Sequence, residues 1–180
     1  IEGTGGPYVK FVASGDELQA VFPGLTNGST YRVTVVAAND AGDSVPSAVD
    51  AVPYTVPNSP SSVDASRTAS GQVTVSWTAP DFDGGSAIED DYTVHVGGVA
   101  DKGCSGTPVE ASDGSWSCIV EGLVNGTEYA FTVVAANDAG DSPAATSDTA
   151  TVTPRTKPGA PEEVTGVGGN ALGTVSWEAP

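Results

Sequence analysis

The chain contains one long phrase twice. Residues 24–44 read GLTNGSTYRVTVVAANDAGDS, and residues 122–142 read GLVNGTEYAFTVVAANDAGDS. In each copy an Asn-Gly turn precedes a segment in which every second residue is apolar, the pattern of a half-buried β-strand. The copies are about 100 residues apart, which is the length of one β-sandwich domain. A strand-based repeat of this period indicates a series of sandwich domains.

A second repeated phrase marks where a domain begins. Residues 74–80 read TVSWTAP, and residues 174–180 read TVSWEAP. We therefore expect residues 1–55 to be the C-terminal part of one sandwich, residues 56–154 to be a complete sandwich, and residues 158–180 to be the first two strands of a further one. Proline-rich linkers separate these parts, because proline fixes φ and cannot donate to a strand ladder.

Alternating segments predict the individual strands. In the complete domain they lie at residues 62–67, 72–78, 92–96, 115–120, 129–136 and 145–153. In the partial domains they lie at residues 8–13, 17–22, 30–38, 47–55, 163–167 and 173–177. Trp77 and Tyr92 fall on the inward faces of their strands, with Trp77 at the centre of the expected core.

The repeated phrase resembles the second half of fibronectin type III domains. That half reads Gly-Leu, a turn with Gly-Thr, Tyr, alternating apolar residues and then Ala-x-Asn-x-Ala-Gly-x-Ser. The resemblance covers essentially the whole chain, and it implies an all-β fold of tandem Ig-like antiparallel sandwiches, one complete and two partial. It also implies that Tyr129 is a corner tyrosine whose hydroxyl bonds backbone near Leu123. The residues expected to form the cores or hold the fold are Trp77, Tyr92, Leu123, Tyr129, Tyr31, Leu25 and Trp177.

The two partial domains are complementary. The C-terminal part supplies two opening strands, and the N-terminal part lacks two opening strands. Left alone, each would expose strand edges and half a core. Either the chain is one period of a long tandem array, or separate copies assemble head to tail by donating strands. A third alternative is a truncated chain whose two ends are disordered. In the first two cases the expected partners are adjacent repeats or other copies of the chain.

Charge excludes several classes of partner. Six basic and 23 acidic side chains give a net charge of −17 and a pI near 4.1. Such a surface repels nucleic acid and anionic lipid, and no apolar run is long enough for membrane insertion. The charge suits solubility, including in a salty medium, or the binding of divalent cations. Four carboxylates in and after one loop form a candidate calcium site: Asp81, Asp83, Asp90 and Asp91. Their spacing does not match an EF-hand loop.

Cys104 and Cys118 are the two cysteines of the chain. No further cysteine or histidine lies near them to complete a zinc site, so a disulfide is the better interpretation. A disulfide persists in an oxidising compartment. We therefore expect an extracellular location, secreted or at a cell surface.

No catalytic constellation is present, so we expect that the chain is not an enzyme. His95, the single histidine, falls on an outward strand face with no nucleophile beside it in sequence. Asn27 and Asn125 match the N-glycosylation pattern, but each also belongs to the Asn-Gly turn that the fold requires.

Four small apolar residues stand on the outward face of the repeated strand: Val36, Ala38, Val134 and Ala136. A solvated sheet face would usually carry polar residues there. These four positions are therefore candidate lateral contacts between filaments or neighbouring domains.

Together these features predict a non-catalytic structural repeat of a large extracellular fibre, surface filament or adhesin. One alternative is a spacer module of a secreted polysaccharide-degrading enzyme, which an exposed aromatic strip would favour. Its scattered candidates are Trp116, Phe82 and Tyr54. A decoration of a virion or phage tail is a further alternative, since one sandwich fold serves all these roles.

Overall fold

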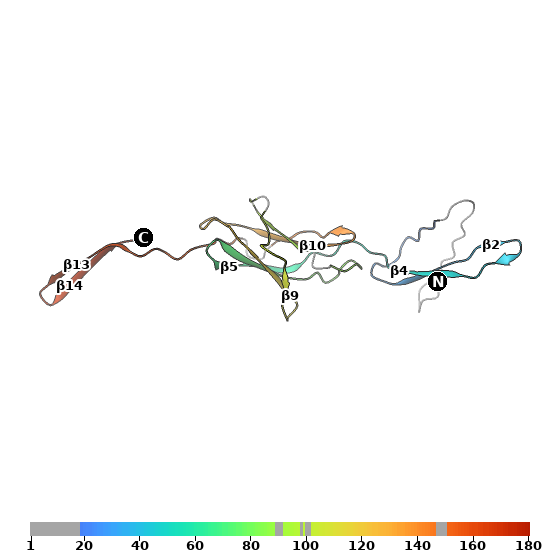
Figure 1. Ribbon diagram of the computed structural model, residues 1–180, viewed down its shortest axis with the longest axis horizontal. Coiled ribbons are helices and arrows are strands. Elements are labelled where there is room, and N and C mark those ends of the chain that lie inside the picture. The colour runs from blue at the N-terminus through green and yellow to red at the C-terminus, as the bar shows by residue number, and fades with distance from the viewer. Residues whose placement is uncertain (1–18, 89–91, 98, 100–101, 147–150) are drawn as a thin grey trace.

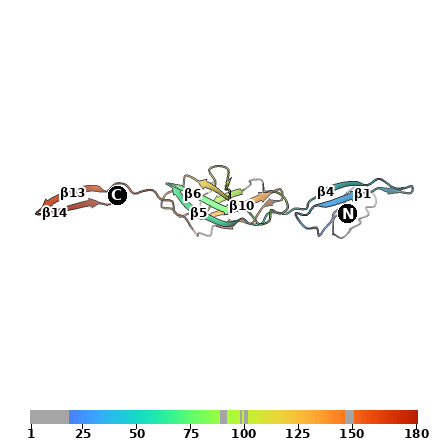
Figure 2. The same cartoon turned by 90° about the horizontal axis from the view of Figure 1, so that it is seen from below.

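The computed structural model describes residues 19–88, 92–97, 99, 102–146 and 151–180. Every regular element that it assigns in these residues is a β-strand. None of the described residues forms a helix that could cross a membrane. Figures 1 and 2 show three groups of strands along the long axis, with the complete sandwich between an N-terminal and a C-terminal group.

Two antiparallel sheets form the complete domain. The first has the order β5-β6-β9-β8, from β5 (Ser61–Ala69), β6 (Gln72–Thr78), β8 (Val109–Glu110) and β9 (Ser115–Val120). The second places β7 (Tyr92–Val96), β11 (Gly140–Asp141) and β12 (Ala145–Thr146) against the long strand β10 (Phe131–Asn137). The all-β sandwich predicted from the sequence is confirmed.

The core lies between these sheets and follows the predicted alternation. In β6 the buried residues are Val73, Val75 and Trp77, and in β10 they are Phe131, Val133 and Ala135. Tyr92, Leu123 and Tyr129 are buried as well. β-Branched valines suit these positions because their stiff side chains pack well on a pleated surface.

Glycine at position 71 suits the turn of the β5–β6 hairpin. Its φ is +67°, in the left-handed region that favours glycine. A Cβ at this position would also lie 2.8 Å from the carbonyl oxygen of Leu123. The turn therefore packs directly against Leu123, in the segment that connects β9 to β10.

The corner tyrosine is present in both copies of the repeated phrase. The hydroxyl of Tyr129 accepts a hydrogen bond from the backbone N–H of Val124 at 3.1 Å. The hydroxyl of Tyr31 accepts one from Thr26 at 2.9 Å. The hydrogen bond expected near Leu123 is therefore formed, and the N-terminal copy repeats it.

The ends of strands differ from the expectation around Tyr129. Strand β10 begins at Phe131, and Tyr129 instead pairs with Val152 in an isolated bridge. The predicted closing strand is present as β12 and this bridge, on either side of residues 147–150, which lie outside the described residues.

The N-terminal group contains two small sheets. Strand β1 (Tyr31–Val35) pairs with β4 (Ser47–Ala51), and β2 (Ala38–Asn39) pairs with β3 (Gly42–Asp43). Residues 19–22 form no strand, and the rest of the strands expected at 8–13 and 17–22 lies outside the described residues. Tyr31 and Leu25, expected to be core residues, are only half-buried, because no described strand covers β1 and β4 in this chain.

The C-terminal group is a hairpin of β13 (Glu162–Gly169) and β14 (Leu172–Glu178). Trp177 was expected in a core, but it is 63% exposed. The reason is that β13 and β14 pair only with each other among the described strands, so nothing covers the face that carries Trp177.

Candidate functional site

The segment that joins the N-terminal group to the complete domain is bound along one loop of that domain. The N–H of Thr55 donates to the carbonyl oxygen of Gly84 at 2.9 Å, and the N–H of Asn58 donates to that of Phe82 at 3.0 Å. The side-chain amide of Asn58 also donates to Asp81 at 2.8 Å. Pro57, between these contacts, is fully buried. The linker is therefore part of the folded structure, and we call residues 53–58 with loop 81–86 the junction.

Asn137, the last residue of β10, ties the junction together. Its side-chain NH₂ group donates to the carbonyl oxygens of Thr55 at 2.8 Å and Asp83 at 2.7 Å. Its side-chain oxygen accepts the N–H of Ala139 at 2.8 Å, which holds the turn after β10. One side chain thus joins the end of a core strand, the loop and the incoming linker.

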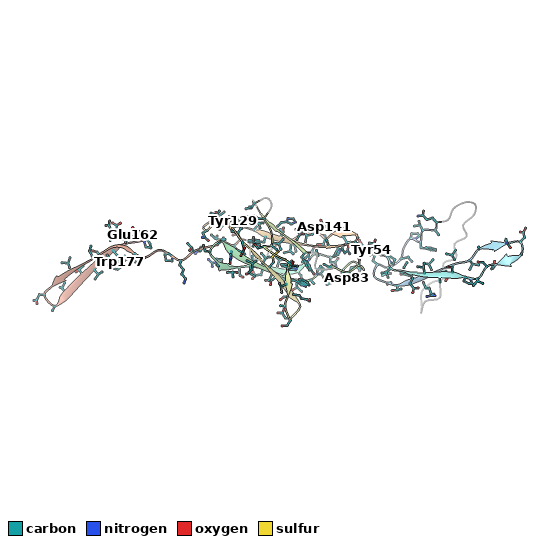
Figure 3. The ribbon with its side chains drawn as sticks, viewed as in Figure 1. Tyr54, Asp83, Tyr129, Asp141, Glu162 and Trp177 are labelled. Atoms are coloured by element: carbon teal, nitrogen blue, oxygen red, sulfur yellow. A yellow bond between two sulfur atoms is a disulfide. The ribbon has the colours of Figure 1, made fainter. Side chains whose placement is uncertain are left out.

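Two glycines allow the backbones to approach this closely. Gly84 and Gly85 have φ values of +82° and +88°. A Cβ at Gly84 would lie 2.0 Å from the carbonyl oxygen of Thr55, and one at Gly85 would lie 2.4 Å from the nitrogen of Gly28. Both positions therefore require glycine for conformation and for space. Figure 3 shows Tyr54 and Asp83 together at the end of the sandwich that faces β4.

Sequence interpretation placed Asn137 in a turn but missed this role. Asn137 and Thr55 are 82 residues apart in the chain. The sequence does show two Asn-Asp-Ala-Gly-Asp turns, at residues 39–43 and 137–141. Only the fold shows that the second turn contacts the linker from the preceding repeat.

The candidate calcium residues have other partners in the junction. Asp81 accepts from Asn58, and Asp83 accepts the N–H of Gly85 at 2.7 Å. Asp90 and Asp91 lie outside the described residues. Across the part of the chain that is described, no three acidic, histidine or cysteine side chains gather in a way that could hold a metal ion. The calcium site stays a prediction.

The disulfide is confirmed. Cys104 and Cys118 are bonded, with their Cα atoms 5.6 Å apart. Next to the bond, the N–H of Ser105 donates to the carbonyl oxygen of Ile119 at 2.7 Å, and the N–H of Glu121 donates to the Ser105 hydroxyl at 3.1 Å. The disulfide therefore fastens the irregular segment before β8 to β9.

The candidate lateral residues fall into two pairs. Val36 and Ala38 are exposed on the N-terminal group, whereas Val134 and Ala136 are half-buried on β10. The structure does not bring the two pairs together into one patch, so lateral contact stays a prediction.

The remaining singled-out residues have ordinary surroundings. His95 is exposed on β7, opposite Thr132 of β10. The ring of Trp116 lies 5.1 Å from that of Tyr92 and packs against the core. The side chain of Asn125 bonds the backbone of Gly71 and the hydroxyl of Ser70, the use expected of a fold-forming turn.

Comparison with known proteins agrees with this architecture. The family model "Fibronectin type III domain" matches residues 58–153. The chain belongs to the fibronectin type III family, and its matched domain is therefore a structural or adaptor module.

The chain is also similar to solved structures. Domains A168–A170 of titin are 26% identical to this chain, with a TM-score of 0.52, over 73% of this chain and 43% of that one. The titin kinase with its flanking domains is 27% identical, with a TM-score of 0.41, over 56% of this chain and 17% of that one. Domains d3–d4 of the rat CD45 extracellular region are 16% identical, with a TM-score of 0.49, over 85% and 78%. The chain spans less than half of either titin structure.

Proposed function

We propose that the chain is a non-catalytic structural segment of a large extracellular fibre, surface filament or adhesin, in which successive fibronectin type III repeats are coupled end to end. The junction is the observation that carries this proposal. Neighbouring domains on a free linker reorient by default. Here the linker is bound by backbone hydrogen bonds and by Asn137, so one repeat holds the next in a set direction.

This coupling suits a spacer that transmits direction or tension. Pulling on the N-terminal group loads the hydrogen bonds of Thr55 and Asn58, which lead into the loop at one end of the sandwich. The strand ladders and the Cys104–Cys118 disulfide then resist extension of the domain itself. The partners of this role are adjacent repeats, and no catalytic group takes part.

An extracellular location is supported by the disulfide, which persists in an oxidising compartment. The net charge of −17 suits filaments that remain dispersed, since like-charged surfaces repel one another.

A spacer in a secreted polysaccharide-degrading enzyme is the second candidate. Tyr54 and Phe82 favour it, because both aromatic side chains are exposed, on the linker and the loop of the junction. Binding of the chain to soluble polysaccharides, lost in the double variant Tyr54→Ala/Phe82→Ala, would favour this candidate over the filament.

The coupling is tested by comparing two glycine substitutions in the full chain. Gly84→Ala places a methyl group against the carbonyl oxygen of Thr55, whereas Gly114 has a similar φ of +80° and open space around it. Both variants carry the same backbone strain, but only Gly84→Ala displaces the linker. Residual dipolar couplings should give one alignment for β1–β4 and the complete domain in the wild type and in Gly114→Ala, and separate alignments in Gly84→Ala. Independent alignments in the wild type would refute the proposal.

A further inference from the structure

The β13–β14 hairpin carries an uncovered copy of a face that is buried elsewhere in the same chain. In β5–β6, Ala65 pairs with Val75, and in β13–β14, Gly166 pairs with Val175 in the equivalent register. The buried face of the first hairpin also includes Ala65 and Val73, which are glycine at the equivalent positions 166 and 173 of the second hairpin. The larger apolar residues of the first hairpin, Val63, Val75 and Trp77, are at most 1% exposed. Their equivalents Val164, Val175 and Trp177 are each about 60% exposed. Figure 3 shows Trp177 on a hairpin that stands apart from the sandwich.

The N-terminal group carries the other half of such a core. Strand β1 repeats the start of β10, and Val35, the equivalent of Val133, is 65% exposed where Val133 is fully buried. Tyr31 and Leu25 are half-buried, whereas Tyr129 and Leu123 are buried. In the complete domain, the residues equivalent to these cover the β5–β6 hairpin.

We propose that the β13–β14 hairpin of one chain packs on the β1–β4 sheet of a second copy of this chain and completes a sandwich there, so that copies assemble head to tail. The complete domain is the template, because it contains the same two surfaces packed together. This inference builds on the proposed structural function and names its partner.

The junction elements also recur at the place where this second copy would dock. The N–H of Gly126 donates to Pro154 at 2.9 Å, as the N–H of Gly28 does to Pro53 at 2.9 Å. The linker that follows Pro154 is exposed, whereas Pro57 in the existing junction is buried. The linker after Pro154 therefore resembles residues 53–58 but lacks contacts like those that residues 53–58 make with loop 81–86 and with Asn137.

The turn that this segment would receive is present at the other end of the chain. Asn39 holds its own turn through the N–H of Ala41 at 2.9 Å, as Asn137 does through Ala139. In the head-to-tail assembly, Asn39 of the second copy takes the place of Asn137 and meets the carbonyl oxygen of Thr156, the equivalent of Thr55.

Charge favours the same pairing. Two of the six basic residues of the chain, Arg155 and Lys157, flank Thr156. Both are exposed, as are Asp40 and Asp43 beside Asn39. An acidic turn therefore meets a basic linker, which selects this contact in a chain whose surface otherwise repels itself.

Two substitutions on opposite faces of one hairpin test the contact. Trp177→Asp and Val167→Asp each replace an exposed apolar side chain by a carboxylate, but Val167 pairs with Thr174 on the other face. Sedimentation velocity of the full chain should show concentration-dependent oligomers for the wild type and for Val167→Asp, and a monomer for Trp177→Asp. A monomeric wild type at all concentrations, or equal behaviour of the two variants, would overturn the proposal.

Complementation separates a specific contact from general stickiness. Val35→Asp disables the accepting sheet and leaves the hairpin intact, and Trp177→Asp does the reverse. Each variant alone should be monomeric, and an equimolar mixture should form a heterodimer that grows no further. A mixture that stays monomeric, or that forms large oligomers, would contradict the inference.

The two proposals can fail separately. The glycine comparison at position 84 tests a junction within one chain and does not depend on association. A rigid junction in a chain that never associates would refute only the head-to-tail contact.

Discussion

Tyr129 and Tyr31 make the same hydrogen bond in different surroundings. Each hydroxyl accepts a backbone N–H five residues earlier in the chain. Tyr129 is buried in the core of the complete domain, whereas Tyr31 is half-buried. A hydrogen bond contributes more when its loss leaves a buried group without a partner.

Replacing each tyrosine by phenylalanine measures this difference. Tyr129→Phe should lower the free energy of unfolding of the complete domain by about 1 kcal/mol, because it leaves the N–H of Val124 without its acceptor. Tyr31→Phe should leave the unfolding of that domain unchanged. Urea denaturation followed by tryptophan fluorescence gives both values, since Trp77 and Trp116 lie in the complete domain. A stability of Tyr129→Phe equal to that of the wild type would show that the corner bond contributes nothing to the complete domain.

Asp113 is placed to report on the turn between β8 and β9. Its carboxylate accepts the hydroxyl of Ser115 at 2.6 Å and the N–H of Ser115 at 3.0 Å. The hydroxyl and then the N–H of Ser115 hold the pKa of Asp113 below its ordinary value of 3.8. A carboxyl whose pKa is depressed on folding stabilises the fold above its unfolded pKa and loses this contribution as the pH falls through its folded pKa.

The pKa of Asp113 should rise toward 3.8 in the variant Ser115→Ala, since the larger of the two hydrogen-bond effects is removed. Carbon-detected NMR titration of the carboxyl group between pH 2 and 6, roughly the range in which aspartate titrates, measures the shift. A titration identical to that of the wild type would show that the Ser115 hydroxyl has no effect on this carboxylate.

At the scale of elements, the disulfide compensates for an irregular segment. Residues 102–108 form no strand, and Cys104 fastens them to β9. A covalent bond limits the freedom of this loop in the unfolded chain, where no strand ladder would hold it.

The double variant Cys104→Ser/Cys118→Ser should therefore unfold more easily. For a sequence separation of 14 residues, the chain-entropy model gives a loss of about 3 kcal/mol. Guanidinium denaturation of the variant and the wild type measures it. A reducing agent should lower the stability of the wild type to that of the variant and leave the variant unchanged; stability that does not respond to reduction would argue against this role.

At the scale of the whole molecule, the junction decides whether the N-terminal group and the complete domain move as one rigid body or reorient independently. Asn137 and Asn39 offer a matched pair, because both hold the turn after their strands but only Asn137 contacts the linker. The difference between them isolates the contact across the junction.

Asn137→Ala should increase proteolysis within residues 53–58, since Thr55 loses its side-chain donor and the linker opens more often. Asn39→Ala should leave cleavage at this segment at the wild-type rate. Limited proteolysis followed by mass spectrometry measures both. Equal rates in the two variants would place the rigidity of the junction in the backbone hydrogen bonds alone.

The strands that could be predicted are those whose pattern is local. Three strands have the predicted ranges: 72–78, 92–96 and 115–120. They could be predicted because a strand with one buried face has an apolar residue at every second position. The exposure of Trp177 could not be predicted in this way. Its own segment differs from that of Trp77 at one of seven positions, TVSWEAP against TVSWTAP, and only the presence of an opposing sheet decides which tryptophan is buried.

The candidate site, too, could be predicted only in part. The two glycines of loop 81–86 and the Asn-Asp-Ala-Gly-Asp turn were visible as turn chemistry, but their common partner was not. Thr55, Gly84 and Asn137 meet because the sandwich brings the end of β10 beside the loop after β6 and the incoming linker.

The sequence by itself determined the family, the repeat, the inward faces of the strands, the corner tyrosine and the disulfide, because each depends on periodicity, on a short motif or on a pair of residues. Only the tertiary structure decided which copies of these faces are buried and which side chains join one repeat to the next. The physical reason is that burial and junction contacts are made between segments distant in the chain, and a local pattern contains no information about what lies opposite it.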